Sequence, residues 1–373
     1  MADQDELIDY GEEPVDTAAT PLERKYSEQM RQIVSQKIDL PISTLPEMIK
    51  EQINLNPDFQ RRDRWDEEKQ SRFIESIIMN VPIPPIFLGE DEYGSYVVLD
   101  GRQRLTAIDE FLKNTFKLKS LKVWEDLNGQ TFNDLQKRKL DRAITRRFVP
   151  AVVILKESSP QVKYDVFDRL NTGGVIAEPM EIRNAVFQGK FNSLIRQLSE
   201  LPTFRRLWGI PTDQAELEKN GLYRKMTDIE LILRFFALSH YDRMDMKFKD
   251  YLSDFMDTRN QEYVQNPALE QEDREVFLKT IDNCWTAFGD AAFRKDPQAT
   301  KSAPLADATM IALSAYPTDT VRQKADGIRG AIRSLLDNNE EFRKAFGTGT
   351  NGKGAIRTRI ELAREAIKGA IEV

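Results

Sequence analysis

The feature that most constrains the fold is the stretch SYVVLDGRQRLTAIDEFL, which runs from Ser95 to Leu112. Its apolar residues are consecutive from Tyr96 to Leu99, as in a buried strand, and after Asp100-Gly101 they follow the 3.6-residue period of a helix. The sequence therefore predicts a strand, a very short turn and a helix. A chain built around such a unit belongs to the α+β class, with a small mixed sheet and flanking helices.

The predicted helix carries two arginines, Arg102 and Arg104, in its first turn. A helix start has unpaired backbone N–H groups and a partial positive charge, so acidic side chains are favoured there and basic ones are not. An anion such as a phosphate bound at the turn would explain the arginines. An ordinary strand-turn-helix with arginines extending into solvent explains the pattern equally well.

The charge distribution separates an acidic N-terminus from a neutral remainder. Of the 61 acids, seven lie in the first twenty residues, where there is no Lys or Arg, so the remainder holds 54 acids and 54 bases. We predict that residues 1–22 form a disordered acidic tail. Such a tail can compete with nucleic acid for a basic groove, but a solubilising role is the preferred interpretation.

The scarcity of cysteine and histidine excludes several chemistries. With one cysteine, Cys284, and one histidine, His240, the chain can form no internal disulfide and no zinc site built from these residues. An HNH nuclease centre needs several histidines and is excluded as well. Any metal would be bound through oxygen ligands, which suits Mg²⁺. No apolar run approaches the ~20 residues of a membrane span and the N-terminus is not a secretory signal, so we expect a cytoplasmic protein without membrane contact.

Two further segments have the composition of ligand-binding loops. Gln60 and Arg61 lie in the polar sequence INLNPDFQRRDRW, between two aromatic residues that could fix its position. The second is the turn Asn171-Thr172-Gly173-Gly174, whose glycines allow the backbone to approach a ligand closely. A helix end followed by a loop is the simpler explanation of that turn.

The rest of the chain divides into a mixed region and a helical region. Strands are predicted at Ile86–Leu88, pairing with the strand from Tyr96, and at Phe148–Leu155, with short β pieces at 118–123 and 130–131. Every element from about residue 191 onward is predicted to be a helix. We therefore expect a sheet-containing domain over residues 23–190 and an all-α domain over residues 191–373.

Two motifs have a functional and a structural interpretation. The run KRKLDRAITRR, from residue 137 to 147, could contact a nucleic-acid backbone, although most such runs are solvated helix faces. Its candidate DNA-binding residues are Lys137, Arg138, Arg142, Arg146 and Arg147. The sequence GTGTNGKG, from residue 347 to 354, fits part of a phosphate-binding loop. A helix precedes it and a glycine replaces the Ser or Thr that should bind Mg²⁺, so we predict a flexible loop before the last helix.

Four blocks in order, NPDFQRRDRW, VLDGRQRLTAI, FDRLNTGGVIAEPMEIRNA and MTDIELILRFFAL, resemble the N-terminal domain family of GmrSD-type modification-dependent restriction enzymes. The resemblance extends over about residues 40–240. It implies a ParB/sulfiredoxin-like fold for the N-terminal domain. The family signature Asp-Gly-Gln-Gln-Arg is changed here, because Arg102 replaces the first glutamine.

The resemblance also implies roles for individual residues. Gln103 and Arg104 would belong to a nucleotide-phosphate site. Independently of the resemblance, Asp100 is the best candidate to bind Mg²⁺ or to orient a water molecule, because it lies at the carboxyl end of the predicted strand. Asp100 could equally cap the helix. The catalytic candidates are thus Asp100, Gln103 and Arg104. The nucleotide-binding candidates are Gln60, Arg61, Gly101, Arg102, Thr106, Asn171, Thr172, Gly173 and Gly174.

The implied function is binding, and probable hydrolysis, of a nucleoside triphosphate in a DNA-targeting restriction or anti-phage defence system. The chain would act with Mg²⁺ as a sensor or regulator and could form a homo-oligomer. With a single histidine, it would depend on a separate HNH nuclease subunit to cut DNA. Two alternatives remain: a DNA-binding module that places the same basic loops on the DNA backbone, and a Mg²⁺-dependent nuclease in its own right.

Overall fold

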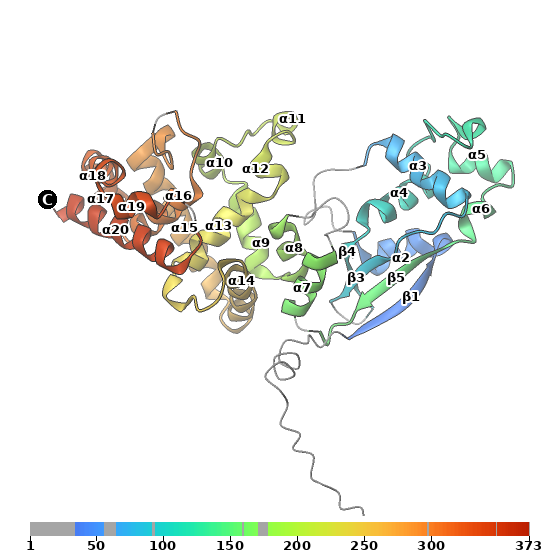
Figure 1. Ribbon diagram of the computed structural model, residues 1–373, viewed down its shortest axis with the longest axis horizontal. Coiled ribbons are helices and arrows are strands. Elements are labelled where there is room, and N and C mark those ends of the chain that lie inside the picture. Colours follow the sequence, from blue (N-terminus) through green and yellow to red (C-terminus); the bar gives the residue numbers. More distant parts are fainter. Residues whose placement is uncertain are drawn as a thin grey trace, which may run out of the picture. The chain divides into compact units, whose positions relative to one another are not determined.

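The strands form one five-stranded mixed sheet in the order β1-β5-β3-β4-β2 (Figure 1). The computed structural model describes residues 34–55, 65–91, 94–158, 160–170, 178–296, 298–347 and 349–372. The strands are β1 (Ser35–Pro41), β2 (Ile53–Asn54), β3 (Ile86–Glu90), β4 (Tyr96–Asp100) and β5 (Phe148–Ile154). β5 pairs antiparallel with β1 and parallel with β3, and β4 pairs antiparallel with β3 and parallel with β2. The predicted strand pair and the strand predicted at Phe148–Leu155 are confirmed, with β5 exposed at Phe148 and only partly buried at Pro150 and Val152.

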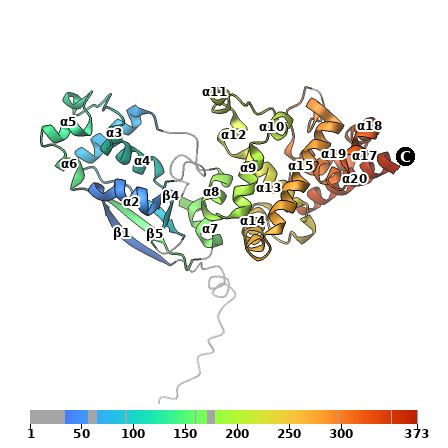
Figure 2. The same ribbon diagram turned by 180° about the vertical axis from the view of Figure 1, so that it is seen from behind.

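Helices α3 and α4 pack against each other and share one hydrophobic core with the sheet (Figures 1 and 2). This core contains Ile74 of α3, Leu105 and Phe111 of α4, and Leu88 and Val98 of the sheet. The helices of this part of the chain are α2 (Leu45–Glu51), α3 (Glu67–Ile78), α4 (Arg102–Leu112), α5 (Phe132–Lys137) and α6 (Arg142–Thr145). The predicted strand-turn-helix is therefore present, with its helix buried against the sheet.

β4 is buried on both faces, which explains its unbroken apolar sequence. Side chains alternate along a strand, so neighbouring residues face opposite sides of the sheet. Val98 belongs to the core with α3 and α4, whereas Leu99 belongs to a second core built mainly from helices. α7 (Pro160–Leu170) and α8 (Pro179–Val186) contact β4.

Past Ile154 the described residues form helices, apart from one isolated bridge between Arg294 and Lys301. The most buried is α13, in which ten of twelve residues are buried, as its nearly all-apolar sequence requires. By backbone contacts Val34–Val373 forms one compact unit, so a domain boundary near residue 190 stays a prediction. The helices are α9 (Lys190–Ser199), α10 (Pro202–Trp208), α11 (Gln214–Leu217), α12 (Gly221–Arg224), α13 (Thr227–Leu238), α14 (Phe248–Gln265), α15 (Ala268–Phe288), α16 (Ala303–Leu313), α17 (Thr318–Gln323), α18 (Ala325–Asn338), α19 (Glu340–Lys344) and α20 (Lys353–Glu372).

The short β pieces predicted at 118–123 and 130–131 are wrong, because neither segment is a strand. A buried carboxylate, rather than a neighbouring strand, accepts the backbone N–H groups at the end of the first segment. Glu75 of α3 accepts hydrogen bonds from the N–H groups of Lys122, Val123 and Trp124, at 3.3, 2.8 and 2.9 Å. No helix among the described residues is long and apolar enough to cross a bilayer.

Candidate functional site

The turn between β4 and α4 depends on Gly101. Its φ of 95° and ψ of 10° are left-handed, a conformation that a side chain disfavours. A Cβ atom there would lie 2.3 Å from Cγ2 of Ile86, so the position is also sterically closed. The chain can therefore pass from strand to helix through one residue only because that residue is glycine. The first intrahelical hydrogen bond joins the N–H of Leu105 to the carbonyl of Gly101 at 3.0 Å.

Arg104 connects the turn to the segment before β3. Its Nη2 lies 2.6 Å from Oδ2 of Asp100, and its Nη1 donates to the carbonyl oxygens of Pro84 and Pro85, the latter at 3.2 Å. The Arg104 side chain is 14% exposed and that of Asp100 is 42% exposed. Arg104 thus orients a carboxylate that solvent can reach. The i,i+4 spacing of the two residues was the signal in the sequence that could have predicted this pair.

Gln103 connects the turn to the polar loop that carries Gln60 and Arg61. Those two residues lie outside the described part of the chain, but the loop ends at Trp65, whose backbone N–H donates to Oε1 of Gln103 at 3.0 Å. The Trp65 ring packs edge-on against Phe73 of α3, with ring centroids 5.6 Å apart. The end of the loop is therefore fixed beside the start of α4.

The turn Asn171-Thr172-Gly173-Gly174 also lies outside the described residues. It belongs to the connection between α7 and α8, and both of these helices contact β4. Arg102, Gln103, Arg104 and Thr106 occupy the first turns of α4, and each is partly accessible to solvent. The structure thus brings together six candidates, Asp100, Gly101, Arg102, Gln103, Arg104 and Thr106.

α8 is anchored by a buried arginine that the sequence did not single out for this role. Arg183 is 1% exposed and donates to Oγ of Ser253, Oε2 of Glu230 and the carbonyl of Lys249, at 3.2, 3.1 and 3.0 Å. Glu181 accepts the N–H of Glu178 at 2.9 Å within a capping box. Its position at the start of α8 is explained by that cap.

Asp100 is the residue that the sequence predicts as a ligand of Mg²⁺, and the structure contains no second acid beside it that completes a metal site among the described residues. No group of three or more His, Cys, Asp or Glu residues that could bind a metal occurs among the described residues. Mg²⁺ commonly uses one or two carboxylates together with substrate phosphates and water, so one acid is compatible with a nucleotide-bound ion. Oδ2 of Asp100 is paired with Arg104, and Oδ1 meets no described residue.

The basic run is a surface feature, as expected for a solvated charge run. Lys137, Arg138, Arg142 and Arg146 are exposed and Arg147 is partly buried. Lys137 forms an ion pair of 3.0 Å with Asp134. These residues lie on α5, on α6 and next to them, and they are not part of the turn at Gly101.

Comparison with known proteins supports the resemblance inferred from the sequence. Residues 42–188 match the family model described as GmrSD restriction endonuclease, N-terminal domain. The match contains three of the four sequence blocks, and the fourth block, which ends with α13, lies beyond it. No curated protein and no solved structure matches the chain. Strands β2 to β5, the Gly101 turn and α8 thus lie in the region that is similar to the N-terminal domain of GmrSD restriction endonucleases.

Proposed function

We propose that the chain is a nucleoside-triphosphate-binding and hydrolysing subunit of a DNA-targeting restriction or anti-phage defence system. The family match supports the restriction role. The observation that carries the nucleotide site is the turn at Gly101, where a forced left-handed residue joins a half-exposed aspartate to a helix start with two arginines. We further propose that the mixed sheet is a form of the ParB/sulfiredoxin-like fold.

In this proposal the phosphates bind at the start of α4. The helix dipole and the backbone N–H groups of the first turn favour an anion there, and Arg102 adds a charge-assisted hydrogen bond of ~1.5–3 kcal/mol. Arg104, already paired with Asp100, fixes the carboxylate. Phosphoryl transfer mainly requires positioning and charge neutralisation, so arginines and a helix start are suitable groups for it.

Asp100 is the residue that would bind Mg²⁺ or orient the attacking water. When bound, the ion would neutralise charge on the phosphates. The carboxylate is suited to either role because one oxygen is held by Arg104 and the other faces no described residue. Cutting of DNA by an HNH centre would require a nuclease from outside this sequence, which contains a single histidine.

A second candidate function is DNA binding without nucleotide. The exposed bases on and beside α5 and α6 favour it, because Lys and Arg side chains that neutralise DNA phosphates release counterions. Binding that falls steeply with salt and is unchanged by nucleotide would support this function alone. Nucleotide-dependent binding would support a coupled system.

Thermal unfolding with a panel of nucleoside triphosphates and Mg²⁺ tests the nucleotide site. A ligand at about 100 times its Kd stabilises the native protein by ~2.7 kcal/mol, which is a readily measured rise in Tm. We expect at least one nucleotide to raise the Tm. If none does at millimolar concentration, the nucleotide function is wrong.

The site is assigned by Arg102→Ala, which removes the proposed phosphate contact without breaking the Arg104–Asp100 pair. We expect a tenfold or greater loss of nucleotide affinity, equivalent to ~1.4 kcal/mol. The matched control is Arg72→Ala in α3, which removes an exposed arginine whose 2.6 Å ion pair joins it to Glu68. Equal affinity in the wild type and both variants would place the nucleotide elsewhere.

A further inference from the structure

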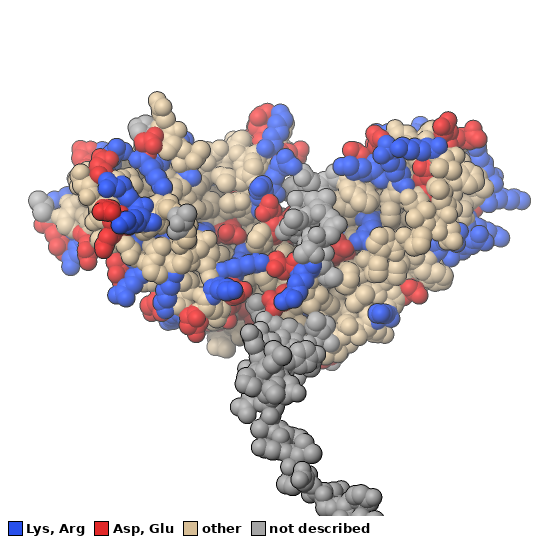
Figure 3. Space-filling model, in the orientation of Figure 1, with Lys and Arg blue, Asp and Glu red and all other residues tan. Residues whose placement is uncertain are grey.

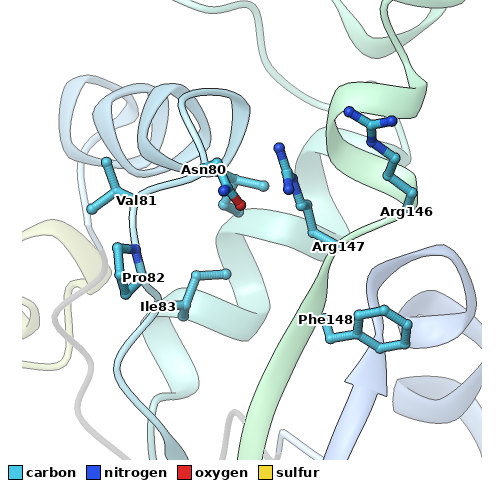
Figure 4. A pocket seen from close by; sticks show the side chains of 8 residues that line it. Asn80, Val81, Pro82, Ile83, Arg146, Arg147 and Phe148 are labelled. Carbon is cyan, nitrogen blue, oxygen red and sulfur yellow. The ribbon is translucent and has the colours of Figure 1, made fainter.

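A pocket of about 360 Å³ lies between the segment after α3 and the segment between α6 and β5. One side is formed by Asn80–Ile83 and the other by Arg146–Phe148, with Ile77 of α3 also in the lining. Figure 4 shows the Arg147 side chain extending into this space toward Asn80. None of the residues in the lining is Asp or Glu.

The lining combines apolar surface with hydrogen-bonding groups. Val81 and Phe148, on opposite sides of the pocket, remain 46% and 55% exposed. Arg147 is held by its backbone, since its carbonyl accepts the N–H of Ile42 at 2.9 Å, and its Nε donates to the carbonyl of Ala143 at 3.3 Å. Within the described residues, the two terminal nitrogens of Arg147 meet no acceptor. A fixed arginine thus offers its donors to the pocket.

The surface beside the pocket is basic and largely unneutralised. Arg138, Lys139 and Arg142 are exposed, and no described carboxylate forms an ion pair with them or with Arg146. Figure 3 shows Lys and Arg side chains gathered over α5 and α6. A chain of negative charges could follow this surface from the pocket outward.

We propose that this pocket binds one unpaired nucleotide of a DNA strand, with its base in the pocket and the neighbouring phosphates on the α5–α6 surface. A base has apolar faces, which the Ile83 side chain at the pocket can cover, and a polar edge, which Asn and Arg side chains recognise. The volume is near the lower limit of ligand pockets, which suits a single base rather than a large cofactor. This inference rests on the proposed DNA-targeting function and identifies the surface of the protein that contacts the DNA.

The base must be unpaired because a pocket of this kind cannot receive a base stacked within a duplex. Extruding a base costs a few kcal/mol, and least where the base is already mismatched or single-stranded. We therefore expect a single strand, or a duplex with one unpaired base, to bind more tightly than an intact duplex. The phosphate contacts predict that log K falls with log salt concentration, by roughly 0.7 for each contact on a single strand.

The experiment measures binding of the full chain to fluorescent DNA that carries one 2-aminopurine, as a single strand, as an intact duplex and as a duplex with that base mismatched. The variants are Arg146→Ala and Arg147→Ala, and Val81→Glu, which places a carboxylate at the pocket and retains both arginines. The controls are Arg72→Ala and Val123→Glu, which change exposed residues outside the pocket. Circular dichroism and Tm verify that each variant is folded.

We expect each pocket variant to weaken single-strand binding at least tenfold and to abolish the change in 2-aminopurine fluorescence, while the controls bind like the wild type. Unchanged binding in folded pocket variants would overturn the pocket and leave DNA binding intact. Equal affinity for the intact duplex would overturn the unpaired DNA nucleotide as occupant. Competitive displacement of the DNA by a free mononucleotide, with an inhibition constant equal to the Kd of that mononucleotide at the Gly101 turn, would also overturn it. No DNA binding in any form would overturn both this inference and the DNA-targeting function. The nucleotide site stays testable by its own thermal shift.

Discussion

Two turns in this protein each combine a left-handed glycine with an aspartate–arginine ion pair, but the aspartate is exposed at one turn and buried at the other. Gly101 and Gly349 both have left-handed backbones, with φ of 95° and 74°, and each lies shortly before a helix. Beside each turn an aspartate is paired with arginine. At the first turn the aspartate, Asp100, is 42% exposed, whereas at the second Asp307 is 3% exposed.

Hydrogen bonds from a buried cluster of charged residues stabilise the second turn. Asp307 lies 2.6 Å from Arg234 and 2.8 Å from Arg359, and Arg359 also donates to the carbonyl of Thr350. Burial is the main reason why the pKa of Arg359 is lowered, and the nearby Arg234 lowers it further, while Asp307 opposes both. These groups bind one another and the loop, so they serve the structure. The predicted loop before the last helix is confirmed at residues 347 and 349–352, whereas Lys353 and Gly354 already belong to α20.

The comparison teaches that exposure, and not residue type, separates a candidate site from a structural cluster. An exposed ion pair contributes ~0–1 kcal/mol to stability, but breaking a buried pair costs ~3–5 kcal/mol because a charge is left unpaired. The Gly101 turn therefore retains charged groups that can act on a ligand at small structural cost.

The largest effect is expected from Asp307→Asn. It removes the carboxylate from between Arg234 and Arg359 and leaves two buried guanidinium groups, so we expect a loss of ~3–5 kcal/mol in the free energy of unfolding. Urea denaturation measures this. The control is Asp319→Asn, whose ion pair with Arg322 is on the surface and whose removal should have little effect. A loss below ~1 kcal/mol for Asp307→Asn would contradict the inference that the buried Asp307 cluster has a larger structural role than the exposed Asp100–Arg104 pair.

The next effect separates the two glycines. Gly101→Ala combines left-handed strain with a Cβ clash against Ile86, so we expect a loss of ~2–4 kcal/mol. Gly349→Ala has strain but no atom within 4 Å of the added Cβ, so ~1–2 kcal/mol is expected. The measurement is the difference between the two variants in urea. Equal losses would mean that the close approach of Ile86 relaxes without cost.

The sequence predicted much of the turn but little of what fixes it. The change from strand to helix periodicity located β4 and α4. Arg102 and Arg104 indicated a candidate anion site there, because basic side chains are unfavourable at the start of a helix. The carbonyls of Pro84 and Pro85 could not be predicted as partners of Arg104, because they depend on how β3 enters the sheet. The pocket at Arg146–Phe148 was missed for the same reason.

Local patterns also failed where a side chain replaced a strand as hydrogen-bond partner. The segment at 118–123 has the apolar content of a strand, but Glu75, 48 residues away from Val123, accepts its last N–H groups. A local sequence pattern cannot predict a hydrogen bond between residues that are so far apart in the sequence. The sequence Thr227-Asp228-Ile229-Glu230 has the spacing of a capping box, but the N-cap of α13 is Met226 and Glu230 pairs with Arg183.

Glu75 gives a third prediction, because it is a buried carboxylate held by N–H groups rather than by arginines. Burial acts to raise its pKa, but the hydrogen bonds from Trp124, Val123 and Lys122 outweigh burial and lower the pKa below the ordinary 4.5. The resulting stability is present above pH 4.5 and is lost as the pH falls through the lowered value. Glu75→Gln should cost ~1–3 kcal/mol at pH 7, since it leaves donors unsatisfied.

Urea denaturation at pH 7, 5 and 3 measures the Glu75 effect. The difference between the wild type and Glu75→Gln should shrink below pH 4.5, where the wild-type carboxyl also becomes protonated. The control is Glu68→Gln in the same helix, whose ion pair with Arg72 is half exposed. A difference that stays constant across this pH range would mean that packing, and not the charge, is responsible.

The smallest effect on stability is expected at the turn itself. Asp100→Asn retains an oxygen for Arg104 and removes one half-exposed charge, so the free energy of unfolding should change by less than ~1 kcal/mol. The same change removes the carboxylate that is proposed to bind Mg²⁺. Nucleotide affinity in Asp100→Asn should therefore lose its dependence on Mg²⁺, which titrations with and without the metal would measure. If affinity keeps its full Mg²⁺ dependence, the half-exposed carboxylate serves only as the partner of Arg104, because Gly101 and not Asp100 is the N-cap of α4, and the contrast with Asp307 is one of stability alone.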